Sequence, residues 1–186
     1  MGKNFFLIMI DRFKGRYYFL SNFYPCKVKH RGIEYPSVEH YYVAQKIKGI
    51  QHYQGQYFTE TDFKELLSKV KNPADVKKMG SSLKLRSDWN DIKLGVMLFG
   101  VEYKFSKDEK LKEMLLSTGN ESIIEGNFWH DNFWGNCSCD KCRNINGENN
   151  LGKILMRVRD DLRPKKETSF EDMINENFFR SSGSEE

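Results

Sequence analysis

Apolar residues recur along the chain at two different spacings, and these spacings predict its elements. The run FFLIMI (5–10) is typical of a buried strand, because every position in it is apolar. CKVKHRGIEYP (26–36) alternates apolar and polar positions around an Arg-Gly turn, which predicts a short hairpin. The intervening YYFLSNFYP (17–25) is rich in aromatic residues and ends in proline, and we expect a loop around Ser21-Asn22.

The spacing changes to that of a helix in PSVEHYYVAQK (36–46). Ser37 is the predicted N-cap, because its hydroxyl can accept a hydrogen bond from an amide of the first turn. Glu39 then lies in that turn, where the helix dipole favours negative charge. Since residues three and four apart share a face, Glu39, Tyr42 and Lys46 line one side. The pattern fits either a capped surface helix or one wall of an active site.

The remaining apolar positions predict further helices and one more strand, SIIEG (122–126). The expected helices are a broken helix over 52–70, a helix from Asn72-Pro73 to a stop at Gly80, one that opens at Ser87-Asp88-Trp89, one with the capping-box pair Ser106 and Glu109, and a closing helix over 151–162. We therefore expect one α+β domain, mostly helical, over residues 1–163, with a small β-sheet near its N-terminus. Residues 164–186 are polar and charged, and we expect a tail outside this domain.

Length and composition fit one domain with a hydrophobic core. The chain has 186 residues, of which 39% are hydrophobic and 14% aromatic, and this excludes a chain that is disordered throughout. Its net charge of +4 is compatible with an anionic small molecule or with nucleic acid. No apolar run approaches the roughly 20 residues of a membrane-spanning helix. The N-terminus lacks the features of an export signal, so we expect a reducing, cytoplasmic location.

Several common catalytic motifs do not occur in the sequence. It has no P-loop, no dinucleotide-binding glycine motif and no nucleophile elbow, which argues against the common nucleotide hydrolases and Rossmann enzymes. Three other segments hold more polar and aromatic groups than a fold needs. They are EHYYVAQK (39–46), LRSDWNDIK (85–93) and NFWHDNFWGN (127–136).

Asp131 stands between Trp129 and Trp134 in the third of these segments. A carboxylate flanked by large aromatic rings is partly removed from water, which suits it to act as an acid or a base. Tryptophan rings also provide stacking surfaces for a planar base. The alternative is that both tryptophans belong to the core and that Asp131 caps a turn.

Cys137, Cys139 and Cys142 form the motif CSCDKC in the same region. A structural zinc site needs four ligands, often supplied as two close pairs. The motif supplies three, with His130 as a candidate fourth ligand and Cys26 distant in the sequence. The spacing therefore allows a structural zinc site, with reduced, metal-free thiols as the simpler expectation.

Taken together, these segments resemble the NADAR, or YbiA-like, family. The motifs that match the family pattern, in order, are FLSNFYP (19–25), EYPSVEHYYVAQK (34–46), MG with LRSDWNDIKLGVM (79–97), KFSKDEKLKEMLLSTG (104–119), DNFWGN (131–136) and NNLGKILMRVR (149–159). The resemblance covers residues 5–162. The cysteine motif resembles an insertion present in some members only, and the tail has no counterpart in the family.

The resemblance implies an N-glycosidase, a hydrolase that cleaves ribosylated amines and needs no cofactor. It implies two substrate types, the ribosylamino-pyrimidine phosphates of early riboflavin synthesis and ADP-ribose attached to guanine bases of nucleic acid, and the sequence leaves both open. By motif, the family's essential glutamate, tryptophan and aspartate correspond to Glu39, Trp89 and Asp131. All three are present, which favours an active-site wall over a surface helix at residues 36–46.

The resemblance and the chemistry of C–N cleavage give these residues expected roles. Glu39 would be the ionised group facing the anomeric carbon, Asp131 the acid or base or the group that orients the ribose hydroxyls, and Trp89 would stack on the base. Lys46 is the candidate for a second route, in which a neutral amine captures the anomeric carbon as a Schiff base. Among the other expected substrate-binding residues, Arg86, Lys93 and Lys153 would hold the phosphates of the substrate. These expected residues are Asn22, Arg86, Lys93, Trp134, Gly135 and Lys153.

Two functions from other classes compete with catalysis. The first is a reader module that binds ADP-ribose or modified bases without cleaving them. The second is a nucleic-acid binder, whose affinity would depend steeply on salt concentration. The intact motif residues disfavour the first. The modest net charge and the lack of a clustered basic stripe disfavour the second.

Overall fold

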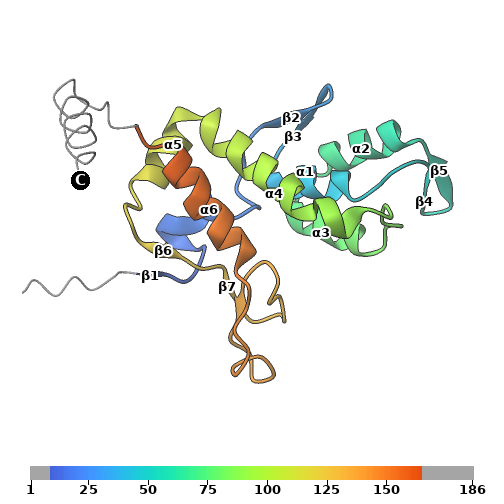
Figure 1. The fold of residues 1–186 in the computed structure, drawn as a ribbon. Coiled ribbons are helices and arrows are strands. Elements are labelled where there is room, and N and C mark those ends of the chain that lie inside the picture. The colour runs from blue at the N-terminus through green and yellow to red at the C-terminus, as the bar shows by residue number, and fades with distance from the viewer. Residues whose placement is uncertain (1–8, 165–186) are drawn as a thin grey trace, which may run out of the picture.

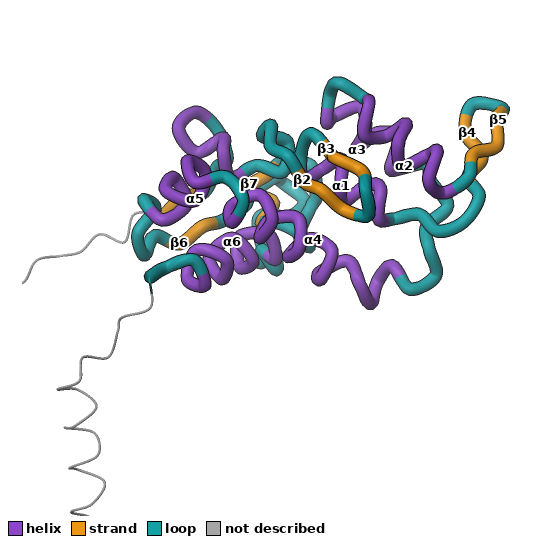
Figure 2. The backbone as a smooth tube through the Cα atoms, turned by 90° about the horizontal axis from the view of Figure 1, so that it is seen from above, coloured by secondary structure: helices purple, strands orange, loops and turns teal. Residues whose placement is uncertain are grey.

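Two groups of helices meet along α4 in the computed structural model of the chain, which describes residues 9–164 (Figure 1). α4 packs against α1 toward one end of the molecule and against α5 and α6 toward the other (Figure 2). The helices are the 3-10 helix η1 (Gly15–Leu20) and the α-helices α1 (Val38–Gln45), α2 (Glu60–Lys69), α3 (Pro73–Ser81), α4 (Trp89–Ser106), α5 (Glu109–Leu116) and α6 (Asn150–Asp161).

The strands of the described chain form four separate two-stranded ladders. β1 pairs in parallel with β6 and β7 with β8, whereas β2–β3 and β4–β5 are antiparallel hairpins. The α+β class and the hairpin over 26–36 are confirmed, but the β-structure is spread along the chain and does not form one sheet near the N-terminus. The strands are β1 (Met9–Ile10), β2 (Val28–His30), β3 (Ile33–Tyr35), β4 (Gln51–Tyr53), β5 (Gln56–Phe58), β6 (Ser122–Ile123), β7 (Gly126–Asn127) and β8 (Asn136–Cys137).

α1 lies at the centre of the core, and every residue in it is buried. The predicted cap is confirmed, because the Ser37 hydroxyl accepts a hydrogen bond from the backbone N–H of His40. The His40 ring also joins α1 to the end of α2, with Nε2 2.9 Å from the carbonyl oxygen of Val70. The surface-helix interpretation is therefore wrong: α2, α3, α4 and the β2–β3 hairpin all pack against α1.

Two glycines allow the neighbouring helices to approach α1 closely. A Cβ atom at Gly100 of α4 would stand 3.0 Å from a ring carbon of Tyr41, and one at Gly80 of α3 would stand 2.9 Å from a methyl carbon of Val43. Gly80 is therefore a packing residue in the last turn of α3, which ends at Ser81, one residue beyond the predicted stop. α3 begins as predicted, with the Asn72 side chain accepting the Ala74 N–H ahead of its first turn.

Other differences from the predicted elements follow from local turn and cap chemistry. Residues 17–20 belong to η1, and the expected loop around Ser21-Asn22 follows it. The N-terminal part of the expected broken helix is the β4–β5 hairpin, because Gln54 and Gly55 both take the positive φ angles of a tight hairpin turn. α5 is capped by Asp108, whose carboxylate accepts the Leu111 N–H, whereas Ser106 ends α4.

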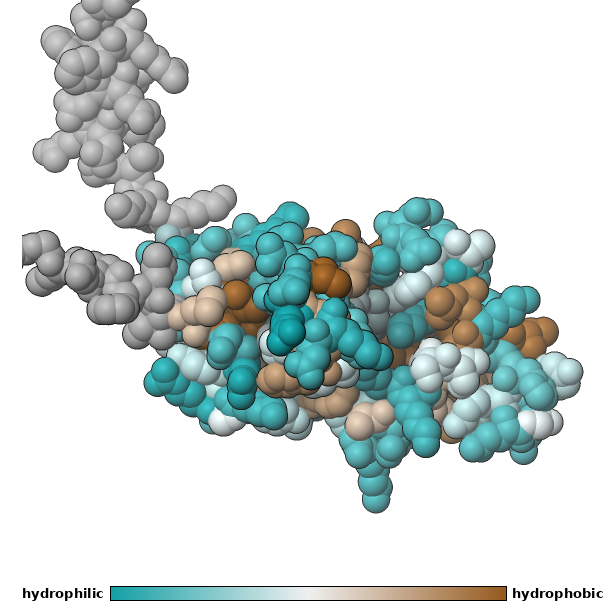
Figure 3. Space-filling model, turned by 90° about the horizontal axis from the view of Figure 1, so that it is seen from below, coloured by the Kyte–Doolittle hydropathy of each residue, from teal (hydrophilic) through white to brown (hydrophobic). Residues whose placement is uncertain are grey.

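The domain surface carries small groups of apolar side chains separated by polar ones, as the view from below shows (Figure 3). Within residues 9–164, no helix is both long and apolar enough to cross a membrane. α6 closes the described fold as predicted. The expected tail after residue 164 lies outside the described residues, so the boundary at residue 163 stays a prediction.

Candidate active site

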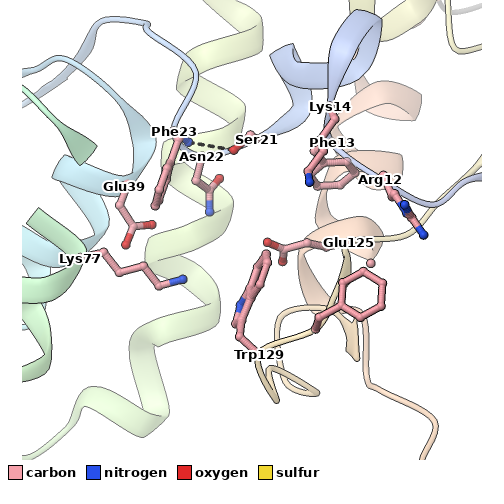
Figure 4. Close-up of a pocket in the computed structure, with 12 residues that line it drawn as sticks. Arg12, Phe13, Lys14, Ser21, Asn22, Phe23, Glu39, Lys77, Glu125 and Trp129 are labelled. Atoms are coloured by element: carbon pink, nitrogen blue, oxygen red, sulfur yellow. Dashed lines mark hydrogen bonds between the residues drawn. The ribbon is translucent and has the colours of Figure 1, made fainter. Parts of the chain in front are cut away.

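Two adjoining cavities open between α1, α3, η1 and the segment 125–134. They share four lining residues, Asn22, Glu39, Lys77 and Glu125. The first, which we call the aromatic cavity, spans about 740 Å³ including its opening to solvent, and its other lining residues include Arg12, Phe13, Lys14, Phe23, Phe128 and Trp129 (Figure 4). The second, the acidic cavity, adds Tyr42, Lys46, Met97, Asp131 and Trp134.

Glu39 reaches the cavities from the first turn of α1. Its backbone N–H donates to the carbonyl oxygen of Asn22 at 3.0 Å, which ties α1 to the loop that follows η1. The side chain is only 7% exposed, and burial raises the pKa of its carboxyl group. The nearby Lys77 and Lys46 ammonium groups oppose that rise in pKa, and Asp131 adds to it. Glu39 is therefore a desolvated carboxyl whose charge depends on two lysines.

The two lysines approach Glu39 from different helices. Lys46 lies at the C-cap of α1, on the same face as Glu39, with its ammonium 5.2 Å from the centre of the Tyr42 ring. Burial lowers the pKa of Lys46, an effect that the Glu39 charge opposes. Lys77 comes from α3, and its ammonium lies between two aromatic rings, 5.8 Å from the centre of Phe23 and 5.7 Å from that of Trp129.

Glu125 provides a second carboxyl, half-buried, opposite Glu39 (Figure 4). It lies between β6 and β7, where its backbone N–H donates to the Asn149 side chain at 3.0 Å and its carbonyl accepts the Asn136 N–H at 2.9 Å. Its Oε2 atom is buried and has no hydrogen-bond partner among residues 9–164. Burial, reinforced by the negative charge of Asp131, raises the pKa of Glu125 to about 7. This carboxyl can therefore exchange a proton near neutral pH.

Asp131 lines the acidic cavity and also caps a turn, whereas Trp129 is 59% exposed, so the alternative that both flanking tryptophans belong to the core is wrong. Its Oδ1 accepts the backbone N–H of Trp134 at 2.8 Å. Asn127 fixes the loop around it: the amide nitrogen donates to the Asp131 carbonyl at 2.7 Å, and the amide oxygen accepts the Asp131 N–H at 3.2 Å. Gly135 leaves no room for a side chain, since a Cβ atom there would lie 2.1 Å from the Glu125 carbonyl oxygen.

The acidic cavity brings together five of the residues that the sequence selected. They are Asn22, Glu39, Lys46, Asp131 and Trp134. Gly135 does not line a cavity, but its close contact with the Glu125 backbone brings the walls of the site together. Trp89 lies in the core beneath the acidic cavity, with its ring centre 5.0 Å from that of Tyr42. Tyr42 lines the cavity in turn, so in this structure Trp89 supports the wall through that residue.

The other cations expected to hold phosphates lie elsewhere. Arg86 forms a two-pronged ion pair with Asp88, with nitrogen–oxygen distances of 2.5 and 2.9 Å. The Lys93 ammonium lies 3.9 Å from the centre of the Phe133 ring. Lys153 lines a separate surface groove between α4 and α6. None of the three lines either of the two cavities that contain Glu39.

Glu125, Lys77 and Arg12 line these cavities and were not selected from the sequence. Glu125 lies within the predicted strand 122–126, and a carboxylate directly after two isoleucines in a strand is a signal that could have drawn attention to it. Lys77 stands in an ordinary amphipathic helix, and Arg12 in a polar turn. No local pattern distinguishes these two cations from solvent-exposed ones.

Comparison with known proteins gives one family for this chain. The NADAR domain family matches residues 10–163. A riboflavin biosynthesis protein of Vibrio vulnificus is 35% identical over 146 residues, which cover 77% of this chain and 35% of that protein. An N-glycosidase of Nostoc punctiforme is 34% identical over 145 residues, covering 77% of this chain and 84% of the relative. The chain thus spans about a third of the first relative and most of the second.

The same family appears among solved structures. The NMR structure of the Escherichia coli protein YbiA superimposes with a TM-score of 0.64 at 27% sequence identity, covering 86% of this chain and 90% of that one. The N-glycosidase YbiA of Escherichia coli strain K12 is 31% identical over 144 residues, which cover 76% of this chain and 79% of the relative. The fold, the matched residues and these relatives agree, and the chain belongs to the NADAR domain family.

Proposed function

We propose that the protein is an N-glycosidase that hydrolyses a ribosyl C–N bond in the acidic cavity. The observation that carries this proposal is the grouping of Glu39, Glu125 and Asp131 with two lysines around one partly desolvated space. Cleavage of such a bond needs one group that stabilises a cationic sugar and another that protonates the departing base. Two of the relatives described above are named as N-glycosidases, which supports the same chemistry.

The proposed reaction divides the work between Glu39 and Glu125, whose carboxyl groups are both largely removed from water. The electron pair of the C–N bond leaves with the base nitrogen, and Glu125, which is partly protonated near pH 7, gives that nitrogen a proton. Ionised Glu39, balanced by Lys77 and Lys46, stabilises the positive charge on the anomeric carbon. A water molecule then adds to the anomeric carbon. Asp131 accepts a proton from this water, and the proton is returned to Glu125. In the net reaction, the C–N bond and one O–H bond of water are broken, and a C–OH group and an N–H group are formed.

We assign binding of the rest of the substrate to the aromatic cavity. Arg12 and Lys14 are exposed cations on its lining, in reach of phosphates that extend from the ribose. Phe23 and Trp129 offer ring faces on either side of Lys77, and Trp129 is 59% exposed. An open, cationic and aromatic cavity next to the reaction centre favours a substrate larger than a mononucleotide. We therefore propose ADP-ribose on a guanine base as the substrate, in a reducing, cytoplasmic setting.

Substrate preference is tested by measuring kcat/KM for two substrates under the same conditions. One is an oligonucleotide carrying ADP-ribosylated guanine, and the other is a ribosylamino-pyrimidine phosphate of the riboflavin route. We expect the oligonucleotide to be cleaved with the higher kcat/KM. The Arg12→Gln variant should have a higher KM for the oligonucleotide, because one phosphate contact is lost. Arg31→Gln, an exposed arginine on the β2–β3 turn, is the matched control. A higher kcat/KM for the pyrimidine phosphate would assign the protein to that substrate class instead.

Lys46 offers a covalent alternative to direct attack by water. Its lowered pKa leaves a larger share of neutral amine, which can add to the anomeric carbon of a ring-opened ribosylamine and form a Schiff base. In the proposed water route, borohydride added during turnover leaves the protein mass unchanged. An adduct on Lys46, absent in Lys46→Arg and retained in the exposed-site control Lys48→Arg, would instead establish the covalent route.

A further inference from the structure

Outside the proposed reaction centre, the fold brings His130, Cys137, Cys139 and Cys142 into one group. Their ligand atoms all lie within 4.8 Å of one another. The imidazole Nδ1 of His130 is 3.2 Å from the Cys139 sulfur and 3.3 Å from the Cys142 sulfur. A tetrahedral zinc ion with bonds of about 2.3 Å to sulfur and 2.0 Å to nitrogen requires sulfur–nitrogen separations of roughly 3.5 Å. We propose that these four side chains form a structural zinc site.

The chemistry of the four side chains selects zinc and a structural role. Thiolates and imidazole are the ligands of structural zinc, and four protein ligands close the tetrahedron so that no position is left for water or substrate. Binding releases the protons of the three thiols. All four cysteines of the chain are free, so no disulfide uses these sulfurs. Cys26 stands apart from the group, next to β2.

The local backbone already has the arrangement of a metal-binding turn. The backbone N–H groups of Cys142 and Arg143 both donate to the carbonyl of Cys139 at 2.9 Å, and this turn brings Cys139 and Cys142 side by side. The N–H of His130 donates to the Cys137 sulfur at 3.3 Å, a contact that stabilises a sulfur carrying negative charge. β8 pairs with β7 and thereby holds Cys137 beside the segment that carries His130.

The segment that holds these cysteines has almost no core of its own. Between residues 138 and 146, Cys142 is the only buried side chain, and Ile145 is 54% exposed. The segment extends away from the helices (Figure 1). A stretch with so little buried apolar surface needs another cross-link to keep one conformation, and a metal ion supplies it. A zinc ion would therefore supply the cross-link that packing does not provide in this segment.

The proposed ion would also fasten one wall of the reaction centre. His130 lies between Trp129, which lines the aromatic cavity, and Asp131, which lines the acidic cavity. Its backbone takes a left-handed conformation, with φ of 65°, that residues with a side chain rarely adopt. A bond from its imidazole to the metal would fix that conformation and with it the positions of both neighbours. The ion would thus position catalytic groups without touching the substrate.

The test is the metal content of the full chain, purified with reductant and without added metal, measured by mass spectrometry. We expect one zinc per chain, loss of zinc in Cys139→Ser, and full retention in Cys26→Ser, the matched control. Cobalt added to metal-free protein should give the visible absorption of a tetrahedral thiolate site together with proton release. These measurements do not depend on any catalytic activity.

Two results would overturn the zinc site. One is a wild-type chain with reduced thiols that contains no zinc above background and gives no tetrahedral cobalt spectrum. The other is equal loss of zinc in Cys26→Ser and Cys139→Ser.

The positioning role is tested on metal-depleted protein that keeps its helical circular dichroism. In this protein we expect kcat to fall by a larger factor than KM rises, and added zinc to restore kcat. An unchanged kcat would limit the ion to a stabilising role.

Discussion

Replacing Glu39 by glutamine is expected to lower the rate of C–N cleavage by about 10³-fold, the loss typical of removing one group that stabilises charge in the transition state. Glutamine keeps the shape of the side chain but carries no charge to place against the cationic sugar. Folding should not suffer, because burial already raises the pKa of the Glu39 carboxyl and so disfavours its charge. We expect the thermal midpoint of Glu39→Gln to equal or exceed that of the wild type. The measurements are kcat with saturating substrate and thermal unfolding of both proteins.

The matched control is Glu65→Gln, which removes an exposed carboxylate from α2, where Glu65 pairs with Lys69. Its kcat should equal that of the wild type. A Glu39→Gln variant that stays folded and cleaves at the wild-type rate would remove Glu39 from the chemistry. The reaction would then have to rely on Glu125, Asp131 or Lys46.

Replacing Glu125 by glutamine is expected to lower kcat about 10²- to 10³-fold and to change the pH profile, as for loss of a general acid. The pKa of Glu125 is raised to about 7, so its carboxyl carries the needed proton below that pH and loses it above. In the wild type, kcat/KM should fall on the alkaline side of pH 7. In Glu125→Gln, the remaining rate should not show that fall. The measurement is kcat/KM from pH 5 to 9 for both proteins.

Stability gives a second measurement for Glu125 that does not involve substrate. The pKa of Glu125 is about 7 in the folded protein and near 4.5 in an unfolded chain. The protonated carboxyl therefore contributes its full share of stability below pH 4.5, and this contribution is lost as the pH rises to about 7. The difference amounts to about 3 kcal/mol. Glu125→Gln should lack this loss, while Glu102→Gln, an exposed carboxylate on α4, should retain it. Identical pH dependence in wild type and Glu125→Gln would show that Glu125 does not titrate in this range.

The elements that the sequence predicted correctly have strong local signals. The Ser37 hydroxyl caps α1, the Asn72-Pro73 pair begins α3, and the period of the last helix identifies α6. Where one residue has two roles, the sequence identified only one of them. Gly80 looked like a stop because glycine commonly ends helices, but contact with Val43 requires a residue without a side chain there. Whether a glycine ends a helix or packs against one depends on tertiary contacts.

The same reasoning explains which site residues could be predicted. Glu39 and Lys46 share one helix face, so their common cavity follows from local spacing. Glu125 and Lys77 join them from a strand end and a separate helix, and only the packing of α3 on α1 and of β6 on α6 brings them together. The four candidate metal ligands lie in one short stretch, and the sequence identified all of them. His130 joins the cysteines because β7 and β8 pair.

The central claim, hydrolysis of a ribosyl C–N bond, is tested most directly by quantifying both products from one substrate. Wild-type protein is incubated with an oligonucleotide carrying ADP-ribosylated guanine, and the released ADP-ribose and the restored guanine are measured over time by chromatography. We predict equal molar amounts of the two, formed over many turnovers by wild type and almost absent with Glu39→Gln. Tight binding of the modified oligonucleotide without release of ADP-ribose, and an equally intact ribosylamino-pyrimidine phosphate, would contradict the claim and identify a binding module.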